Sequence, residues 1–163
     1  MKKTIITVIM LLAILAIFGA CESKKAANPK PLVSGSQTDL NVQYVRIGYG
    51  SDFPTYTIID SREMLNHFHF SRNISNISLR DSEFLNAISK YTDSFFTNNF
   101  LVIICLNEPS GSNRHKVEKI DSNGDIIIKQ LIPEIGTADM ATWLIFIELK
   151  NSFKLERYRV VLE

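Results

Sequence analysis

The 163-residue sequence has few cysteines, little net charge and no apolar run of comfortable membrane-spanning length. Its 18 basic residues nearly balance its 17 acidic ones, which gives a formal net charge of +1. A near-neutral chain lacks the basic surface with which proteins neutralise a phosphate backbone, so nucleic acid is not an expected partner. A membrane span needs about 20 predominantly apolar residues, whereas the N-terminal run at 5–18 is 14 residues long.

This N-terminal run has the pattern of a secretory leader. Two lysines precede it, and the small residues Gly19 and Ala20 follow it, just before Cys21. The sequence Phe18-Gly19-Ala20-Cys21 resembles a bacterial lipobox, although that motif usually has leucine where Phe18 stands. The pattern therefore predicts a lipoprotein signal peptide at 1–20 and a diacylglyceryl group on Cys21, which becomes the first mature residue.

The lipobox also predicts where the protein lives. Two acyl chains hold a protein stably on a membrane, whereas a single chain holds it only reversibly. We therefore expect an extracytoplasmic, membrane-anchored bacterial lipoprotein. Two other interpretations stay open, a secreted protein with an incidental cysteine and an uncleaved N-terminal anchor helix. Removal of residues 1–20 takes two lysines away, so 16 basic residues face 17 acidic ones and the mature net charge is about −1.

Composition divides the mature chain into a linker and a domain. Residues 21–39 are rich in Lys, Ala, Asn, Pro and Ser and have almost no bulky apolar residues, which predicts a flexible membrane-proximal linker. The domain is expected at 40–163. Once Cys21 is acylated, Cys105 is the remaining thiol, so no internal disulfide can form. Its place in the apolar stretch FLVIICL predicts a packed small side chain rather than a nucleophile.

The first half of the domain combines strands with two helices. The stretches NVQYVRIGYG and TYTIID have strand composition and are divided by a turn at 51–54. Asp60 and Glu63 form a capping-box pattern that predicts a helix over about 61–70, and a second capped helix is expected from Asp81. The expected apolar faces of the two helices hold Met64, Leu65 and Phe68, and Phe84, Leu85 and Ile88.

The second half reads as strands to the end. FLVIICL and TWLIFIEL are continuously apolar, which predicts central strands buried on both faces. The charged RHKVEKI predicts a strand near an edge, joined to DIIIKQLI by an Asn123-Gly124 hairpin, and YRVVLE closes the chain. The fold class is therefore α+β, a single domain with a mainly antiparallel sheet covered on one face by one or two short helices.

Two groups of residues have the composition of a chemical site. His67 and His69 lie two positions apart, which on a helix points them to nearly opposite sides, so we expect no metal site there. Ser110, Ser112 and His115, with Asp139 in a later loop, supply the parts of a Ser-His-Asp triad. No G-x-S-x-G elbow accompanies them, and a Ser-Gly-Ser turn needs no catalytic explanation.

The two loops themselves are the better candidates for function. The first contains Ser110, Gly111 and Ser112, with His115 close behind, and the second is PEIGTADMATW. Small and uncharged residues predominate in the second loop, so it either packs on the end of the sheet or forms a surface for a partner protein, with Met140 as an adaptable apolar contact. The expected contact residues of the second loop are Gly136, Thr137, Asp139 and Met140.

A family resemblance rests on these same stretches. FLVIICLNEPSGSNRHKVEKI followed by GDIIIKQLIPEIGTADMATWLIFIELK resembles the C-terminal domain of the PrcB family and related small bacterial lipoproteins. The resemblance covers about residues 56–163 and departs from the commoner family form between Gly136 and Trp143. It implies an α+β domain, a lipoprotein that accompanies and stabilises a surface protease complex, and no catalytic residue.

Together these patterns predict a non-catalytic, protein-binding or complex-stabilising module of the cell envelope, without a cofactor or metal. Its expected partners are the membrane, through Cys21, and an envelope protein or secreted protease. Two alternatives stay open. One is a small-ligand-binding or sensing lipoprotein, and the other is a small surface hydrolase that uses Ser110 or Ser112 with His115.

Overall fold

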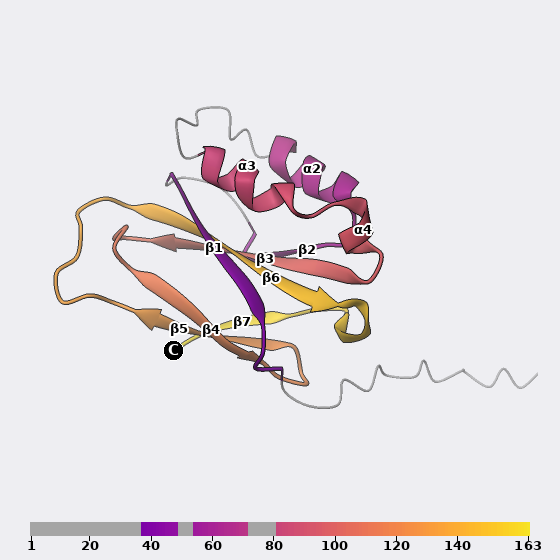
Figure 1. Cartoon of the computed structure of the whole chain (residues 1–163). Coiled ribbons are helices and arrows are strands. Elements are labelled where there is room, and N and C mark those ends of the chain that lie inside the picture. Colours follow the sequence, from indigo (N-terminus) through magenta and orange to yellow (C-terminus); the bar gives the residue numbers. More distant parts are fainter. Residues whose placement is uncertain (1–36, 49–53, 72–80) are drawn as a thin grey trace, which may run out of the picture. The chain divides into compact units, whose positions relative to one another are not determined.

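The fold is organised around two long apolar strands, β3 (Asn99–Glu108) and β6 (Ala141–Lys150). The computed structural model describes residues 37–48, 54–71 and 81–163, all within one compact unit (Figure 1). Both strands are buried along almost their whole length, as their unbroken apolar sequences predict. They pair with each other in antiparallel register and form the centre of the first sheet.

Shorter strands complete this first sheet. Its order is β1-β6-β3-β2, where β1 spans Asn41–Gly48 and β2 spans Tyr56–Ile59, and every pair in it is antiparallel. The predicted turn between the two outer strands lies, apart from Pro54, outside the described residues.

A second sheet has three strands in the order β4-β5-β7. The strands are β4 (Arg114–Ile120), β5 (Asp125–Leu131) and β7 (Arg159–Leu162). The first pair is an antiparallel hairpin, whereas β5 and β7 run parallel. The α+β class with a mainly antiparallel arrangement is confirmed. The division of the strands into two sheets is a feature that the sequence analysis did not predict.

Three short helices cover one face of the first sheet. They are α2 (Arg62–Ser71), α3 (Asp81–Ser89) and α4 (Asp93–Phe96), and a 3₁₀ turn, η2 (Asn151–Phe153), follows β6. Alternate residues of the central strands, such as Ile103 and Phe146, pack against the helices. The prediction that the helices cover one face of the most apolar strands, β3 and β6, is confirmed.

The second sheet covers the opposite face of the same strands. Here Ile104 and Ile145, which are paired across β3 and β6, pack with Val117, Ile126 and Ile128 of the second sheet. The result is three layers, with helices, a four-stranded sheet and a three-stranded sheet in that order (Figure 1). The described members of both cores lie between residues 40 and 160.

Aromatic rings dominate the helix-facing core. Tyr91 and Phe146 stack with ring centroids 6.2 Å apart, and Phe84 tilts against Phe146 at 6.1 Å. All three rings are fully buried, and burial of rings of this size supplies a large share of a core's stability. The Tyr91 hydroxyl donates to Glu148 at 3.2 Å, and burial, together with that carboxylate, raises the pKa of Tyr91.

The β4–β5 hairpin and the start of α2 were both predicted from local sequence patterns. Gly124 has φ of 86°, a left-handed conformation that suits glycine, so the Asn-Gly hairpin prediction is confirmed. The first helix is capped one residue later than predicted, because Ser61 Oγ accepts the amide of Met64 at 3.1 Å. Asp60 instead accepts a hydrogen bond from Lys154 Nζ at 2.5 Å.

Two residues of the predicted apolar faces are exposed. Met64 and Leu85 are 42% and 46% exposed. They flank the buried Leu65 and Phe84 on their helices, so each helix turns a narrower apolar stripe to the sheet than predicted.

The N-terminal end of the described chain joins the second sheet earlier than predicted. Gln37, assigned to the linker, exchanges two backbone hydrogen bonds with Ile120 at 2.8 and 3.0 Å. The Tyr44 hydroxyl also accepts the backbone amide of Val117 at 2.9 Å. Both contacts cover the edge of β4, which would otherwise present unpaired backbone groups. The predicted leader and Cys21 lie outside the described residues, and no described helix is long and apolar enough to cross a membrane.

Candidate functional site at the paired loops

Strand register brings the two predicted loops to one end of the molecule. Glu108 at the end of β3 lies opposite Ala141 at the start of β6, and Arg114 at the start of β4 lies opposite Leu131 at the end of β5. The segments that connect these ends, 109–113 and 132–140, therefore start and finish beside each other. We call them the Ser-Gly-Ser loop and the β5–β6 loop.

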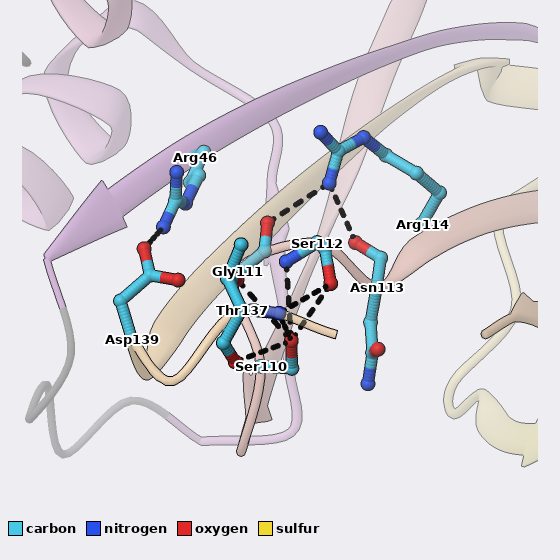
Figure 2. A network of polar contacts seen from close by, with 8 residues as sticks. All are labelled: Arg46, Ser110, Gly111, Ser112, Asn113, Arg114, Thr137 and Asp139. Atoms are coloured by element: carbon cyan, nitrogen blue, oxygen red, sulfur yellow. Dashed lines mark hydrogen bonds and ion pairs between the residues drawn. The ribbon is translucent and has the colours of Figure 1, made fainter. Parts of the chain in front are cut away.

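Side-chain hydroxyls join the two loops (Figure 2). Ser110 Oγ donates to the Thr137 carbonyl at 2.9 Å and accepts the Thr137 amide at 3.0 Å. Because a hydroxyl has a single hydrogen, Ser112 is the donor in the 2.8 Å contact between the two serine oxygens. The same amide also lies 3.2 Å from Ser112 Oγ. The predicted contact residues are thus partners of one another.

Backbone and charge hold the far end of the β5–β6 loop. The Gly111 amide donates to the Asp139 carbonyl at 2.6 Å, and the Asp139 carboxylate pairs with the Arg46 guanidinium from β1. A Cβ on Gly111 would collide with the Arg46 guanidinium and come within 2.6 Å of the Asp139 carboxylate, so a larger residue there would displace this ion pair. Hydrogen bonds from Thr137 and Arg46 hold the pKa of Asp139 below its usual range.

The β5–β6 loop presents apolar side chains to solvent. Ile135 is 87% exposed, Ile132 is 69% exposed and Met140 is 52% exposed, and Leu131 at the start of the loop is 44% exposed. Scattered single apolar residues on a surface are ordinary, whereas a group on one short segment indicates an interaction site. The predicted role of Met140 therefore extends to the two isoleucines, which the sequence analysis did not select.

His115 lies apart from these contact residues, inside the molecule. It was expected on the surface with the Ser-Gly-Ser loop, but its side chain is fully buried and its Nε2 lies 2.7 Å from Glu108 Oε1. Asn113 Nδ2 donates to Glu108 at 2.7 Å, and Gln130 Nε2 donates at 2.8 Å. A buried carboxylate thus has three nitrogen partners that close the base of the loop.

The Trp143 ring packs beside this polar cluster. The His115 and Trp143 rings meet edge to face with centroids 6.1 Å apart, and the Arg114 guanidinium lies 5.0 Å from the Trp143 ring centroid. Arg114 also donates to the carbonyls of Gly111 and Asn113 at 2.9 and 3.0 Å. His115 Nδ1 and Trp143 Nε1 are buried without a hydrogen-bond partner among the described residues.

The parts of the supposed triad make separate contacts. The hydroxyl of Ser110 is engaged by Thr137, the ring of His115 by Glu108, and the carboxylate of Asp139 by Arg46. No hydrogen bond of the described residues links serine to histidine or histidine to Asp139. The nearby acids Glu108 and Glu134 do not form a pair of neighbouring carboxylates, since Glu108 is buried in the cluster and Glu134 is exposed on the loop.

The remaining candidates are dispersed. His67 lies exposed on α2, and the side chain of His69 is outside the described part. Within the described ranges, no group of three histidine, cysteine or acidic side chains is arranged to hold a metal ion. Cys105 is partly buried at the edge of the helix-facing core, in agreement with a packing role.

Comparisons with known proteins give no match from which a function could be inferred. No protein-family model matches the chain, and searches of curated proteins and of solved structures give no significant match.

Proposed function

We propose that the chain is a membrane-tethered, extracytoplasmic lipoprotein whose domain binds or stabilises another envelope protein without catalysing a reaction. The observation that carries this proposal is the exposed apolar group on the β5–β6 loop, with Ile132, Ile135 and Met140 on a segment anchored at Thr137 and Asp139. Apolar contacts of this kind are typical of interface centres, and a partner would remove them from water.

Preorganisation supports a role in binding. An interface loses affinity when a loop must be ordered on association, and a loop already held in place avoids that loss. Here Thr137 is held by two serines, and Asp139 is held by Gly111 and Arg46. Ile135 precedes these anchors and Met140 follows them, so the backbone is held close to two of the exposed apolar side chains.

The sequence supplies the tether and the type of partner. The lipobox that ends at Cys21 supports anchoring outside the cytoplasm, and a mature net charge near zero suits a protein partner better than nucleic acid. The resemblance to the PrcB-like C-terminal domain suggests that the partner is a secreted or surface protease complex. The engagement of Ser110, His115 and Asp139 in other contacts favours binding over hydrolysis.

Site-specific photo-crosslinking in intact cells tests the binding proposal. A photoreactive amino acid placed at Ile135 should give a discrete crosslinked protein, because this side chain is the most exposed of the group. The same amino acid at Leu85 on α3, also exposed and apolar, is the matched control. Crosslinks of equal yield and identity from both positions, or none from Ile135, would refute the assigned surface.

A further inference from the structure

The outer face of the second sheet carries three lysines for which the described part of the chain supplies no ion-pair partner. Residues directly opposite in a sheet share a face, and the register places Lys116 opposite Lys129 and Lys119 opposite Ile127. All three lysines are exposed. No ion pair among the described residues involves any of them.

Like charges directly opposite each other destabilise a pair of strands, so the Lys116–Lys129 pair needs an external explanation. The acids nearby offset it only in part. Asp125 is held by Arg159, Glu118 lies at the bulge in β4, and Glu163 ends the chain beside β5. Ile127 and Val161 are cross-strand neighbours on this face, but Ile127 is buried, so it is mainly the lysines that the face presents to solvent.

The tether reaches the molecule at this same sheet. Gln37, where the described chain begins, pairs with Ile120, the residue that follows Lys119. Only 16 residues, 21–36, separate the proposed anchor from this bridge, and they include three further lysines. A short tether entering beside Lys119 keeps the second sheet within reach of the bilayer that holds the anchor.

We propose that the outer face of the second sheet, through Lys116, Lys119 and Lys129, rests on the anionic phospholipid headgroups of the membrane that anchors the chain. This inference rests on the proposed lipid tether. The lysines supply charge complementarity to these headgroups. The β5–β6 loop leaves the far end of this sheet, so a domain lying flat meets its partner sideways, along the membrane surface.

Vesicle binding by the mature chain without its lipid tests this inference independently of the tether. Residues 21–163 with Cys21→Ser should co-sediment with vesicles that contain phosphatidylglycerol and not with vesicles of phosphatidylcholine alone. Binding should fall as salt screens the lysines. Each of Lys116→Glu, Lys119→Glu and Lys129→Glu should weaken it by roughly fivefold or more, and the triple variant should abolish it.

Lys150→Glu is the matched control, because Lys150 is exposed on β6 and shares the helix-facing side with Phe146. It should leave vesicle binding unchanged. In the lipidated chain on the same anionic vesicles, acetylation should spare Lys116, Lys119 and Lys129 relative to Lys150.

Three results with vesicles would overturn the inference. They are equal binding to both vesicle types, an unaffected triple variant, and a loss with Lys150→Glu as large as that with the face variants. Binding to soluble polyglutamate without binding to anionic vesicles would also overturn it and would indicate an acidic protein instead. Failure of the tether is a separate result, because it would appear as absent fatty-acid labelling of Cys21 while vesicle binding by the unlipidated chain persisted.

Discussion

The helix-facing core and the loop end of the molecule use different interactions. On the helix side, Phe84, Tyr91 and Phe146 interlock within a core that is almost wholly apolar. At the loop end, the second sheet closes on a buried carboxylate, Glu108, and its nitrogen partners, above which hydroxyls and one ion pair hold two loops. Apolar burial is non-directional, whereas hydrogen bonds fix geometry.

From this difference we infer that the helix-facing core supplies most of the stability of the domain, whereas the polar contacts at the loop end hold the two loops in position. We expect substitutions on the helix side to lower the free energy of unfolding of the whole domain. Substitutions above the polar cluster should disturb the loops and leave most of the stability in place. Four predictions, from the largest expected effect to the smallest, test that separation.

Phe146→Ala should have the largest effect, because it removes a fully buried ring that contacts both Phe84 and Tyr91. We expect a loss of about 3–5 kcal/mol in the free energy of unfolding. Chemical denaturation monitored by circular dichroism measures it. A loss below 1 kcal/mol would show that the helix-facing core does not carry the stability assigned to it.

His115→Phe should have an intermediate effect. It keeps a buried ring beside Trp143 but removes the nitrogen that contacts Glu108. Hydrogen bonds to charged groups contribute about 1.5–3 kcal/mol, so we expect a loss in that range. The neighbouring Lys116→Ala, on the exposed side of the same strand, should stay within about 0.5 kcal/mol of the wild type. Equal losses in the two variants would contradict a structural role for the buried cluster.

Ser110→Ala should act mainly on the loops. It removes the hydroxyl that both donates to and accepts from Thr137, and we expect about 1 kcal/mol or less in global stability. Hydrogen exchange of the Thr137 amide should become faster, since that amide loses its nearer acceptor. Ser122→Ala in the exposed β4–β5 turn is the control. An unchanged exchange rate at Thr137 would mean that the serines do not hold the β5–β6 loop.

Acidification should release the other anchor. The pKa of Asp139 is lowered by Thr137 and Arg46, so its contribution is fully present above the ordinary aspartate pKa of about 3.9 and is lost as pH falls through the lower folded value. The Gly111 and Thr137 amide resonances should therefore shift together in strongly acidic solution. Asp139→Asn should remove the shared transition, and an identical titration in that variant would contradict the assignment.

Periodicity and local signals predicted much of the fold. Continuous apolar runs identified β3 and β6 as buried on both faces, and Asn123-Gly124 located the β4–β5 hairpin. The presence of a second sheet was missed because two-sided burial does not reveal what covers each side. The covering layer depends on pairings between strands far apart in sequence, such as β5 with β7.

The candidate site was predicted only in part. Both loops were selected from composition, but their mutual contacts depend on the register that places Glu108 beside Ala141. The buried position of His115 could have been predicted from the alternation of side chains along β4, since His115 and the buried Val117 point to the same face of the strand. Gln130 shares phase with Ile128 on β5 in the same way. No local sequence pattern could identify Arg46 as part of the site, because its partner Asp139 lies 93 residues away in the sequence.

Co-purification from membranes tests the central claim, that the β5–β6 loop binds an envelope protein. The lipidated full chain would be purified in mild detergent as wild type, as Ile135→Asp, and as Leu85→Asp, which makes the same change at an exposed position on α3. We predict that Ile135→Asp loses the protein crosslinked from position 135 while its own level and folding stay normal, and that Leu85→Asp retains it. Retention of that protein by Ile135→Asp at the wild-type level would contradict the account.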